Sequence, residues 1–417
     1  SPTSLRTRSK NNWGRLGMKS EWKEVCLGEI TKWSSGGTPS KNNPLYWNGT
    51  IPWISAKNMP DGWLDDAEPK ITELGLNNGS RLAPSNSILM LVRGSGLYNR
   101  RYICIVKKTV AFNQDVKCIE ASSSVLPEFV YYWLRGNDSM LVSLLESTGI
   151  GAGKFDVSRL QKMHIMVPSL YEQEKLVKVA RSIDDKIALN NKINDNLEQQ
   201  AEALYKAWFI DYLPFAGEKP EEWNNTIIEE LTSLVSRGIT PKYTEDSDQI
   251  VINQKCVRDH RIDLSLARTH TPKKINEKWL QYGDLLINST GEGTLGRAAQ
   301  VWFKPEKMTV DSHVTIVRPK SKELMYYIGF WGLVHEKEIE SLHTGSTGQT
   351  ELPRERIKAM ELVLPDQTTL AIFNAIVQPM TETIINNQIQ NNKLAALRDA
   401  LLPKLMSGEI DVENIRV

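Results

Sequence analysis

The sequence predicts an α+β protein in which two mixed α/β domains are joined by two long helices that form an antiparallel coiled coil. Three observations predict this fold class. The chain repeats itself with a period near 200 residues, each copy ends in a heptad pattern, and each copy begins with short strand-like runs between polar loops. Solenoid units are shorter, roughly 20–50 residues. The long period therefore indicates a duplicated domain with a pseudo-twofold internal repeat.

The repeat is carried by short strings that return in the same order. The matching strings are Glu21-Trp22 with Glu222-Trp223, Gly36-Gly37-Thr38-Pro39 with Gly238-Ile239-Thr240-Pro241, Ile54-Ser55-Ala56-Lys57 with Ile252-Asn253-Gln254-Lys255, Tyr131-Tyr132 with Tyr326-Tyr327, Thr148-Gly149 with Thr344-Gly345, and Val167-Pro168 with Leu364-Pro365. Each half of the chain is therefore expected to be one copy of the same module.

A heptad pattern predicts a long helix over residues 170–212 and another over 366–406. In the first, the seam positions alternate in steps of four and three, which is the a/d spacing of a coiled coil. They are Leu176, Ala180, Ile183, Ile187, Asn190, Asn194, Leu197, Ala201, Leu204 and Trp208. Adding 197 gives the second seam, in which nine of the ten positions keep their polarity, the exception being Ala201 to Arg398. Pro379 is expected to kink the second helix or to limit its first turn.

Four asparagines lie near the middle of the two seams, namely Asn190, Asn194, Asn387 and Asn391. Two readings stand side by side: these residues loosen two surface helices, or they form a buried polar layer that sets the register of the pair. Their identical placement in both copies favours the second. Because long helices gain stability mainly from packing, the two helices are expected to pair with each other. The chain order makes the pair antiparallel and puts the globular domains at opposite ends of a rod of about 60 Å.

The expected domain boundaries follow from these patterns. Residues 1–17 carry a net charge of +4 and are read as a leader or disordered arm, which leaves −3 on the rest. The remaining segments are a first globular domain at 18–169, spacer helix 1 at 170–212, a linker at 213–220, a second globular domain at 221–365, spacer helix 2 at 366–406 and a C-terminal tail at 407–417.

Composition excludes several classes of protein. With 40% hydrophobic and 24% charged residues the chain can bury real cores, and no apolar run approaches the ~18 residues of a membrane span. The four cysteines lie far apart and are read as free thiols in a reducing compartment, the cytoplasm. The mildly acidic body argues against a protein that coats nucleic acid by bulk charge.

Several strings imitate enzyme signatures without their context. Asp61, Glu68 and Lys70 fit a permissive nuclease pattern, and 43–46 is similar to the Asn-Pro-Pro-Tyr loop of amino-methyltransferases but lacks the second proline. The glycines of 291–296 satisfy a dinucleotide fingerprint, yet a strand-like run follows where a helix is required. No metal-ligand spacing is found among the histidines. The chain is therefore expected to have no catalytic residue, no metal site and no cofactor of its own.

Loops at matching positions of the two copies carry residues suited to DNA. Arginine and lysine can bind guanine, asparagine and glutamine can bind adenine, and hydroxyl groups suit phosphates. The candidate DNA-binding residues are Ser55, Lys57, Asn58, Arg93, Tyr98, Arg100, Arg101, Asn113, Gln114, Lys154, Asn253, Lys255, Ser289, Thr290, Thr294, Arg297, His313, Ser346, Thr347 and Gln349. The 93–101 loop is aligned with 289–297. The competing reading is that these are ordinary polar turns.

The chain resembles the specificity (S) subunit of type I restriction-modification enzymes. The resemblance runs from about residue 19 to the end. It is carried by Gly36-Gly37-Thr38-Pro39-Ser40, Pro44-Leu45-Tyr46-Trp47-Asn48-Gly49-Thr50-Ile51-Pro52-Trp53-Ile54-Ser55, the Ser147-Thr148-Gly149 and Thr344-Gly345-Ser346 loops, and Leu402-Pro403-Lys404-Leu405-Met406-Ser407-Gly408. The second copy lacks the Tyr-Trp-Asn-Gly string and departs more from the pattern.

The resemblance implies two target recognition domains, each of which reads one half of a bipartite double-stranded DNA site. It implies that the helices set the spacing and dock modification subunits, which use S-adenosylmethionine to methylate adenine. Restriction subunits that use ATP and Mg²⁺ would join them. The alternatives are a self-sufficient DNA methyltransferase or nuclease, the specificity subunit of a related type II bipartite system, and a coiled-coil scaffold without a DNA role.

Overall fold

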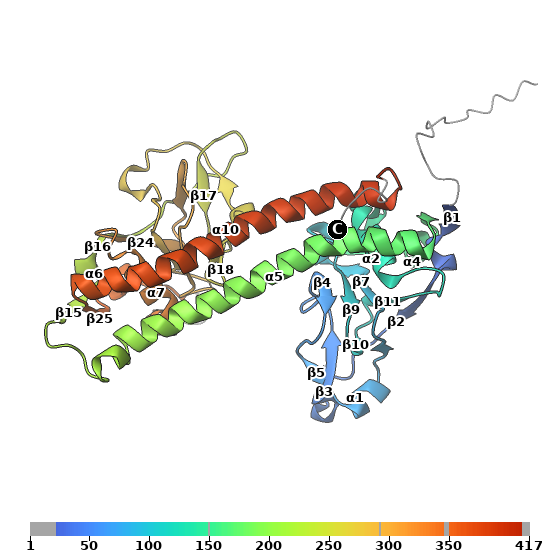
Figure 1. Ribbon diagram of the computed structural model, residues 1–417, viewed down its shortest axis with the longest axis horizontal. Helices are drawn as coiled ribbons and strands as arrows, with labels where there is room; N and C mark the ends of the chain where they lie inside the picture. Colours follow the sequence, from blue (N-terminus) through green and yellow to red (C-terminus); the bar gives the residue numbers. More distant parts are fainter. Residues whose placement is uncertain (1–21, 149–150, 292, 346–349, 411–417) are drawn as a thin grey trace, which may run out of the picture. The chain divides into compact units, whose positions relative to one another are not determined.

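The computed structural model describes residues 22–148, 151–291, 293–345 and 350–410. The chain divides into two compact units, one made of residues up to Leu189 together with those from Asn391 onward, the other of Asn190–Gln390. Each unit holds one globular domain and one part of each long helix (Figure 1). We call the described residues before the first long helix, α5 (Leu170–Phe209), domain 1. Those between α5 and the second long helix, α10 (Gln367–Met406), are domain 2.

Domain 1 is a set of small sheets with helix α2 packed on one of them. Its regular elements are β1 (Lys23–Cys26), β2 (Thr31–Ser35), β3 (Trp47–Ile54), β4 (Gly62–Leu64), β5 (Lys70–Ile71), α1 (Glu73–Asn77), β6 (Leu82–Ala83), β7 (Ile88–Leu91), β8 (Arg93–Gly94), β9 (Ile103–Val106), β10 (Val110–Phe112), β11 (Val116–Ala121), α2 (Pro127–Gly136), α3 (Asp138–Ser143), β12 (Leu145–Ser147), β13 (Gly153–Phe155), α4 (Val157–Gln161) and β14 (His164–Val167). The sheet orders are β1-β14, β5-β3-β10-β6, β2-β11-β7-β9-β4 and β12-β13-β8.

Domain 2 repeats this plan with fewer strands. Its elements are β15 (Asn224–Ile227), α6 (Ile228–Leu231), β16 (Thr232–Arg237), β17 (Ile250–Ile252), β18 (Val257–Arg258), β19 (Arg261–Ile262), β20 (Arg268–Thr269), β21 (Leu285–Asn288), β22 (Ala298–Gln300), β23 (Met308–Val310), β24 (Val314–Pro319), α7 (Met325–Val334), α8 (Glu336–Ser341), α9 (Arg354–Lys358) and β25 (Glu361–Leu364). The sheet orders are β15-β25, β16-β24-β21-β22, β20-β17-β23 and β18-β19.

Matching backbone hydrogen bonds establish which residues of the two domains correspond. The N–H of Asn137 donates to the carbonyl of Trp133, as that of His335 does to Trp331. Helices α2 and α7 thus correspond to each other, and Trp133 of α2 is equivalent to Trp331 of α7. The sequence match of Tyr131-Tyr132 with Tyr326-Tyr327 was therefore wrong by three residues, because the repeated dipeptide is a chance likeness inside two buried helices.

The cores follow from these sheets. Domain 1 buries the strand residues of β7, β9 and β11 under α2, whose side chains from Phe129 to Leu134 are all buried. Domain 2 divides its interior in two. One cluster joins α7 to the long helices, and the other lies among β17, β21, β22 and β24. The four cysteines form no disulfide, and Cys104, Cys118 and Cys256 are buried.

The two long helices have the predicted extent, with one difference. Helix α5 covers Leu170–Phe209 and α10 covers Gln367–Met406, 40 residues each. Helix α5 ends three residues before the predicted Tyr212, which adopts left-handed backbone angles and so cannot continue a helix. Helix α10 runs through Pro379 without interruption. Among the described residues, no helix is both long and apolar enough to cross a membrane.

One pair of seam asparagines, Asn194 and Asn387, meets within the second unit as the seam predicts. The side-chain amide of Asn387 donates to Oδ1 of Asn194 at 2.8 Å, and that of Asn190 donates to Oε1 of Gln390 at 2.7 Å. Asn190 and Asn194 are fully buried. The partner numbers on α10 rise as those on α5 fall, so the helices are antiparallel there. The register role of this layer stays a prediction.

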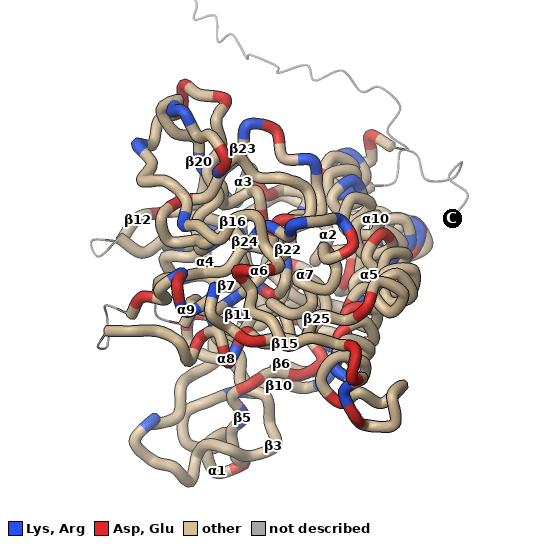
Figure 2. Tube along the Cα trace, turned by 90° about the vertical axis from the view of Figure 1, so that its left-hand side faces the viewer, with Lys and Arg blue, Asp and Glu red and all other residues tan. Residues whose placement is uncertain are grey.

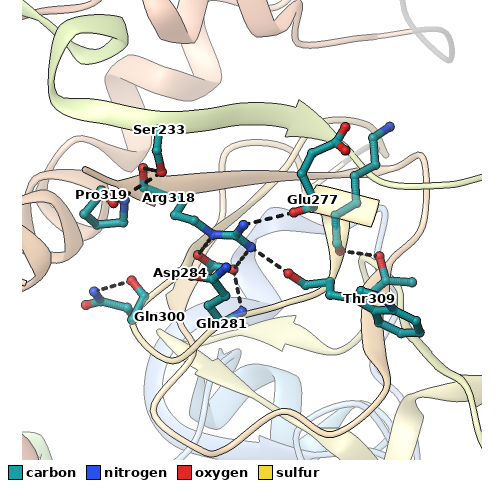
Figure 3. Close-up of polar contacts among 11 residues, drawn as sticks. Ser233, Glu277, Gln281, Asp284, Gln300, Thr309, Arg318 and Pro319 are labelled. Carbon is teal, nitrogen blue, oxygen red and sulfur yellow. Dashed lines mark hydrogen bonds and ion pairs between the residues drawn. The ribbon is translucent and has the colours of Figure 1, made fainter. Parts of the chain in front are cut away.

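Domain 2 also buries an ion pair in its core (Figure 3). The Arg318 guanidinium donates from Nε and Nη2 to the two carboxylate oxygens of Asp284, both at 2.7 Å. It donates further to the carbonyls of Glu277 and Trp279, at 2.9 and 2.7 Å. Each of the three guanidinium nitrogens thereby donates at least one hydrogen bond, which offsets the cost of burying the charge. This pair ties β24 to the turn before β21.

Candidate nucleic-acid interface

Several predicted DNA-binding segments of domain 1 converge at one edge of its sheets. Strands β3 and β10 are parallel, with Phe112 opposite Ile54, so the chain leaves both strands at the same edge. The N–H of Asn113 donates to the Ile54 carbonyl at 2.9 Å, and that of Val92 to the Asp115 carbonyl at 2.8 Å. The turns 55–58 and 113–115 therefore adjoin Arg93. We call these segments, together with Lys154, the strand-end junction of domain 1.

Two cations face each other in this junction. Arg93 on β8 lies directly opposite Lys154 on β13 in an antiparallel ladder. Residues so placed share one face of the sheet, and like charges there destabilise it. Both side chains are exposed, and among the described residues neither forms a salt bridge with an acid; Glu146, which lies opposite Lys154 on its other side in the β12–β13 ladder, is paired with Arg159 at 2.9 Å. A bound anion would relieve this repulsion.

Domain 2 builds the same junction from different side chains. The N–H of Asp311 donates to the Ile252 carbonyl at 2.9 Å, and that of Ser289 to the His313 carbonyl at 2.8 Å. Thr290 takes the place of Arg93, and Glu351 lies opposite it in the place of Lys154. Glu351 forms an ion pair with Arg237. This strand-end junction of domain 2 is thus polar where the first is cationic.

The hydrogen bonds of the second junction order its side chains. The Thr290 hydroxyl lies 2.7 Å from Nδ1 of His313 and donates to Oε1 of Gln254 at 3.1 Å. Asp311 accepts the N–H of His313 at 2.9 Å, and burial raises the pKa of its carboxyl group. Lys255 is exposed here, as Lys57 is at the same place in domain 1.

Comparison with known proteins gives this duplicated plan a family. A model of the type I restriction modification DNA specificity domain matches residues 19–199. The MjaIX specificity subunit of a type I restriction enzyme from Methanocaldococcus jannaschii is 29% identical over 438 residues, covering 95% of this chain and 98% of that protein. The chain is thus similar to type I restriction-modification specificity subunits, over its first half by the domain model and over nearly its whole length by this relative.

Two further relatives agree. The EcoR124I/EcoR124II specificity subunit of Escherichia coli is 35% identical over 208 residues, which is 49% of this chain and 50% of that protein. Among solved structures, the S subunit of a type I restriction-modification system from M. genitalium has a TM-score of 0.53 at 14% identity, covering 96% of this chain and 98% of that one. At that identity the likeness shows the fold alone.

Several predicted contact residues form hydrogen bonds that support the fold. The Asn58 amide donates to the carbonyls of Trp53 and Glu68 at 2.8 and 2.7 Å. Oδ1 of Asn113 accepts two backbone N–H groups, and Asn253 uses its amide in the same way as Asn58. These hydrogen bonds hold the turns in place, and the role of the three residues in contacting DNA stays a prediction.

Two other candidates have side chains that are largely buried and bonded within the protein. Ser289 is fully buried, and its hydroxyl lies 2.6 Å from that of Thr315. Arg101 donates to both carboxylate oxygens of Asp138 at 2.5 and 2.6 Å, with its side chain 15% exposed. The alignment of Arg93 with Ser289 was one residue out, since the ladder places Thr290 there. We leave these residues out of the proposed interface.

The remaining candidates keep exposed or partly exposed positions. Tyr98 is 47% exposed, Gln114 accepts from the Thr38 hydroxyl at 2.7 Å, and Arg100 forms an ion pair with Asp61 at 2.9 Å. Ser55 lies on the first turn, while Thr294 and Arg297 are half-buried after the second junction. Ser346, Thr347 and Gln349 lie outside the described residues.

Sequence reasoning missed Glu351 and Arg237 as members of the second junction. It also missed a basic stretch around β20, where Arg268 lies 3.6 Å above the ring of Tyr243 and Lys273 and Lys274 follow (Figure 2). An aromatic ring beneath an arginine is suited to stacking on nucleic acid. The string of basic residues was visible in the sequence, but its aromatic partner lies 25 residues earlier.

The enzyme-like strings have structural uses. Asp61 is paired with Arg100, and Lys70 is paired with Asp66 at 3.0 Å. Asn43 accepts the N–H of Leu45 and caps a short helix. Within the part of the chain that the structure describes, no group of three acidic, histidine or cysteine side chains could hold a metal ion.

Proposed function

We propose that domains 1 and 2 each read one half of a bipartite double-stranded DNA target, and that the strand-end junctions are the surfaces that touch it. The observation that carries the proposal is that one backbone junction is built twice and lined with different side chains. A shared frame with different chemistry is what two readers of different half-sites need. As a specificity subunit, the chain recognises DNA and leaves catalysis to others.

The chemistry of each junction supports a division between phosphate and base contacts. In domain 1, Arg93 and Lys154 are placed to hold phosphate oxygens, while the exposed Gln114 beside them carries an amide that can read a base edge. In domain 2, Thr290, His313 and Gln254 offer donors and acceptors without net positive charge. Lys57 and Lys255 add one cation to each surface.

Helices α5 and α10 are proposed as the spacer and as the docking surface for modification subunits. Large apolar side chains remain exposed along them, namely Leu189, Ile193, Ile389 and Leu397. Exposed apolar residues in a row on a helix suit a protein partner. The modification subunits would use S-adenosylmethionine to methylate adenine, and restriction subunits would use ATP and Mg²⁺. A complex that acts on cellular DNA works in the cytoplasm, and this chain would hold no cofactor.

The boundaries proposed for these roles are those expected from the sequence, with spacer helix 1 shortened to Phe209. Each helix of 40 residues is about 60 Å long. If the pair sets the distance between half-sites, one added heptad in both helices lengthens it by about 10 Å. The preferred gap should then grow by about three base pairs, at ~3.4 Å each.

The proposed function is tested by mapping adenine methylation in cells that contain the subunit and its modification partners. Exchanging residues 224–364 for the corresponding domain of a relative should change one half of the methylated motif and leave the other half and the gap unchanged. A matched exchange of domain 1 should change the opposite half. Loss of both halves from one exchange in an assembled complex would contradict the proposal.

The competing function, a self-sufficient methyltransferase or nuclease, has a direct test. The purified chain is supplied with S-adenosylmethionine and DNA, or with Mg²⁺ and plasmid, without any partner. We expect no methyl transfer and no cleavage, whereas turnover by the chain alone would overturn the specificity role.

A further inference from the structure

In the first unit, domain 1 meets the long helices through a polar network. Asp184 of α5 accepts from the Tyr132 hydroxyl at 3.0 Å and from Arg398 of α10 at 2.7 Å. Arg135 of α2 lies 3.9 Å from the same carboxylate and donates to the Tyr131 hydroxyl at 2.6 Å. The side chains of Asp184 and Arg398 are each only 12% exposed. The single exception in the repeated seam, Arg398, is thus the partner of an acid on α5.

In the second unit the corresponding network is apolar. By the seam repeat of 197 residues, Asp184 corresponds to Thr381, and Arg398 corresponds to Ala201. In the correspondence of α2 with α7, Tyr132 is equivalent to Phe330, and Arg135 is equivalent to Leu333. Ala201 and Thr381 are 1% and 5% exposed, and the Thr381 hydroxyl donates to the Val377 carbonyl of its own helix. No acid of the described residues stands at this place to meet a cation.

The C-terminal ends of α5 and α10 also differ, because they carry side chains of different size at corresponding positions. Domain 1 packs against Leu402, Leu405 and Met406 of α10, and a Cβ at Gly136 would lie 3.1 Å from the Leu402 carbonyl carbon. Domain 2 packs against the much larger rings at the corresponding places of α5. These are Tyr205, Trp208 and Phe209. All three contact Phe373 of α10, and Tyr205 and Phe209 also contact Tyr327 of α7 in domain 2.

From these differences we infer that the chain is built for heterotypic pairing: its N-terminal half, domain 1 with α5, accepts the C-terminal half, domain 2 with α10, and rejects a second copy of itself. The approximate symmetry of the seams would otherwise let either half pair with its own copy. The polar network and the helix ends together select the partner. The inference concerns assembly of the chain and does not depend on the proposed function.

Each homotypic pair would violate a packing rule. Two N-terminal halves would bring Tyr205 and Trp208 into a pocket shaped for leucines, where Gly136 already touches backbone, and overpacking of this kind destabilises a core. They would also place Asp184 opposite Ala201. Two C-terminal halves would bury Arg398 against Thr381, Phe330 and Leu333 without Asp184, leaving it only the exposed Asp399 of its own helix at 2.8 Å. A buried charge without its partner is strongly unfavourable, so this device acts against the wrong pair.

The experiment uses the full chain, cut after it has folded. A protease site is inserted after Gly217, where a side chain would meet nothing within 4 Å. Unlabelled and ¹⁵N-labelled proteins are cut, mixed, and held in the lowest urea concentration at which labelled and unlabelled halves exchange completely. Native mass spectrometry then counts heterotypic and homotypic pairs. Exchange of label within the heterotypic pairs shows that the halves have separated and paired again.

For the unmodified chain we expect heterotypic pairs to outnumber homotypic ones by about tenfold or more, instead of the equal numbers of a random mixture. The variant with Asp184→Thr and Arg398→Ala should lower that excess at least severalfold. Arg398→Met, which keeps the volume, should raise the pairs of C-terminal halves specifically. Arg181→Ala with Asp185→Thr removes an exposed pair on the same helix, 3.4 Å apart, and should change nothing. Random pairing by the unmodified chain, or an unchanged ratio in both Arg398 variants, would overturn the inference.

Discussion

Domains 1 and 2 share their backbone junctions but place their charges differently. Domain 2 buries the ion pair of Asp284 and Arg318, whereas matching ladder positions give domain 1 Ser87 and Glu120 there. At the strand-end junction the difference is reversed, with Arg93 and Lys154 in domain 1 and Thr290 and Glu351 in domain 2. The backbone pattern and the apolar core thus define the frame, and a few polar positions define what each copy does.

We expect the largest effect from removing the buried ion pair that distinguishes the core of domain 2 from that of domain 1. Arg318→Ala leaves the Asp284 carboxylate buried in the core, where among the described residues the N–H of Gln281, at 2.8 Å, is its remaining hydrogen-bond donor. Removing one partner of a buried pair costs about 3–5 kcal/mol, so domain 2 should unfold at a much lower urea concentration. Glu120→Ala in domain 1 should change the free energy of unfolding by less than about 0.5 kcal/mol.

The replacement of both partners completes this test. Asp284→Leu with Arg318→Met removes the charges together, and such exchanges are often neutral or stabilising. Urea unfolding followed by tryptophan fluorescence measures all three variants. If Arg318→Ala is no more harmful than Glu120→Ala, the buried pair does not distinguish the two domains.

The second effect contrasts the two helix contacts. Asp184→Ala removes the acid that Arg398 and Arg135 share and leaves Arg398 only the exposed Asp399 of its own helix, and we expect a loss of about 3 kcal/mol. Thr381→Ala removes only a hydroxyl that bonds to its own helix, and should cost less than about 1 kcal/mol. Thermal unfolding of the full chain measures both. Equal losses would show that the polar network adds nothing to the first unit.

The sequence predicted the long helices well because a heptad pattern over 40 residues is a local signal that packing then uses directly. It also marked Arg398 as an exception. The meaning of that exception needs Asp184, which lies 214 residues away in the chain. The recurrence of the loops in both copies was read from the sequence, but their register was not, since a shift of one or three residues leaves short strings looking alike.

The individual contact residues were less predictable, for a chemical reason. Asn58 and Asn113 have the side chain that reads adenine, and it is also the side chain that closes turns. Only the structure shows that both amides are already bonded. Glu351 was missed because an acid does not look like a DNA contact, although it occupies the ladder position where domain 1 has Lys154.

The third effect is a pH dependence that belongs to domain 2. The β18–β19 turn places Nδ1 of His260 3.2 Å from Glu202 of α5 and Nε2 3.7 Å from Glu336. Glu202 first, and then Glu336, raise the pKa of His260 to about 10, although burial opposes them. The neighbouring Arg261 lies 3.3 Å from both Asp195 and Glu198.

Because the pKa is higher in the folded state than the ordinary 6.5, protonated His260 stabilises domain 2 fully below about pH 6.5. That contribution is lost as the pH rises toward 10. We expect it to be about 2 kcal/mol, the size of a hydrogen bond to a charged group, because the side chain is partly exposed and solvent screens it. His260→Gln should remove this dependence. His164→Gln, which affects an exposed pair with Glu24, should keep it. An unchanged pH profile in the first variant would rule out the contact as its source.

The smallest effect concerns the junctions and their salt dependence. Each cation that holds a phosphate adds about 0.9 to the slope of log affinity against log salt concentration. Arg93→Ala with Lys154→Ala should therefore lower the slope by about two without changing the preferred sequence, measured on the full chain assembled with its modification subunits. Glu351→Lys should raise it by about one, because it gives domain 2 the cation that domain 1 has at that ladder position. An unchanged slope in both would mean that the ladder does not face the phosphates, and that the charge difference between the two junctions serves another purpose.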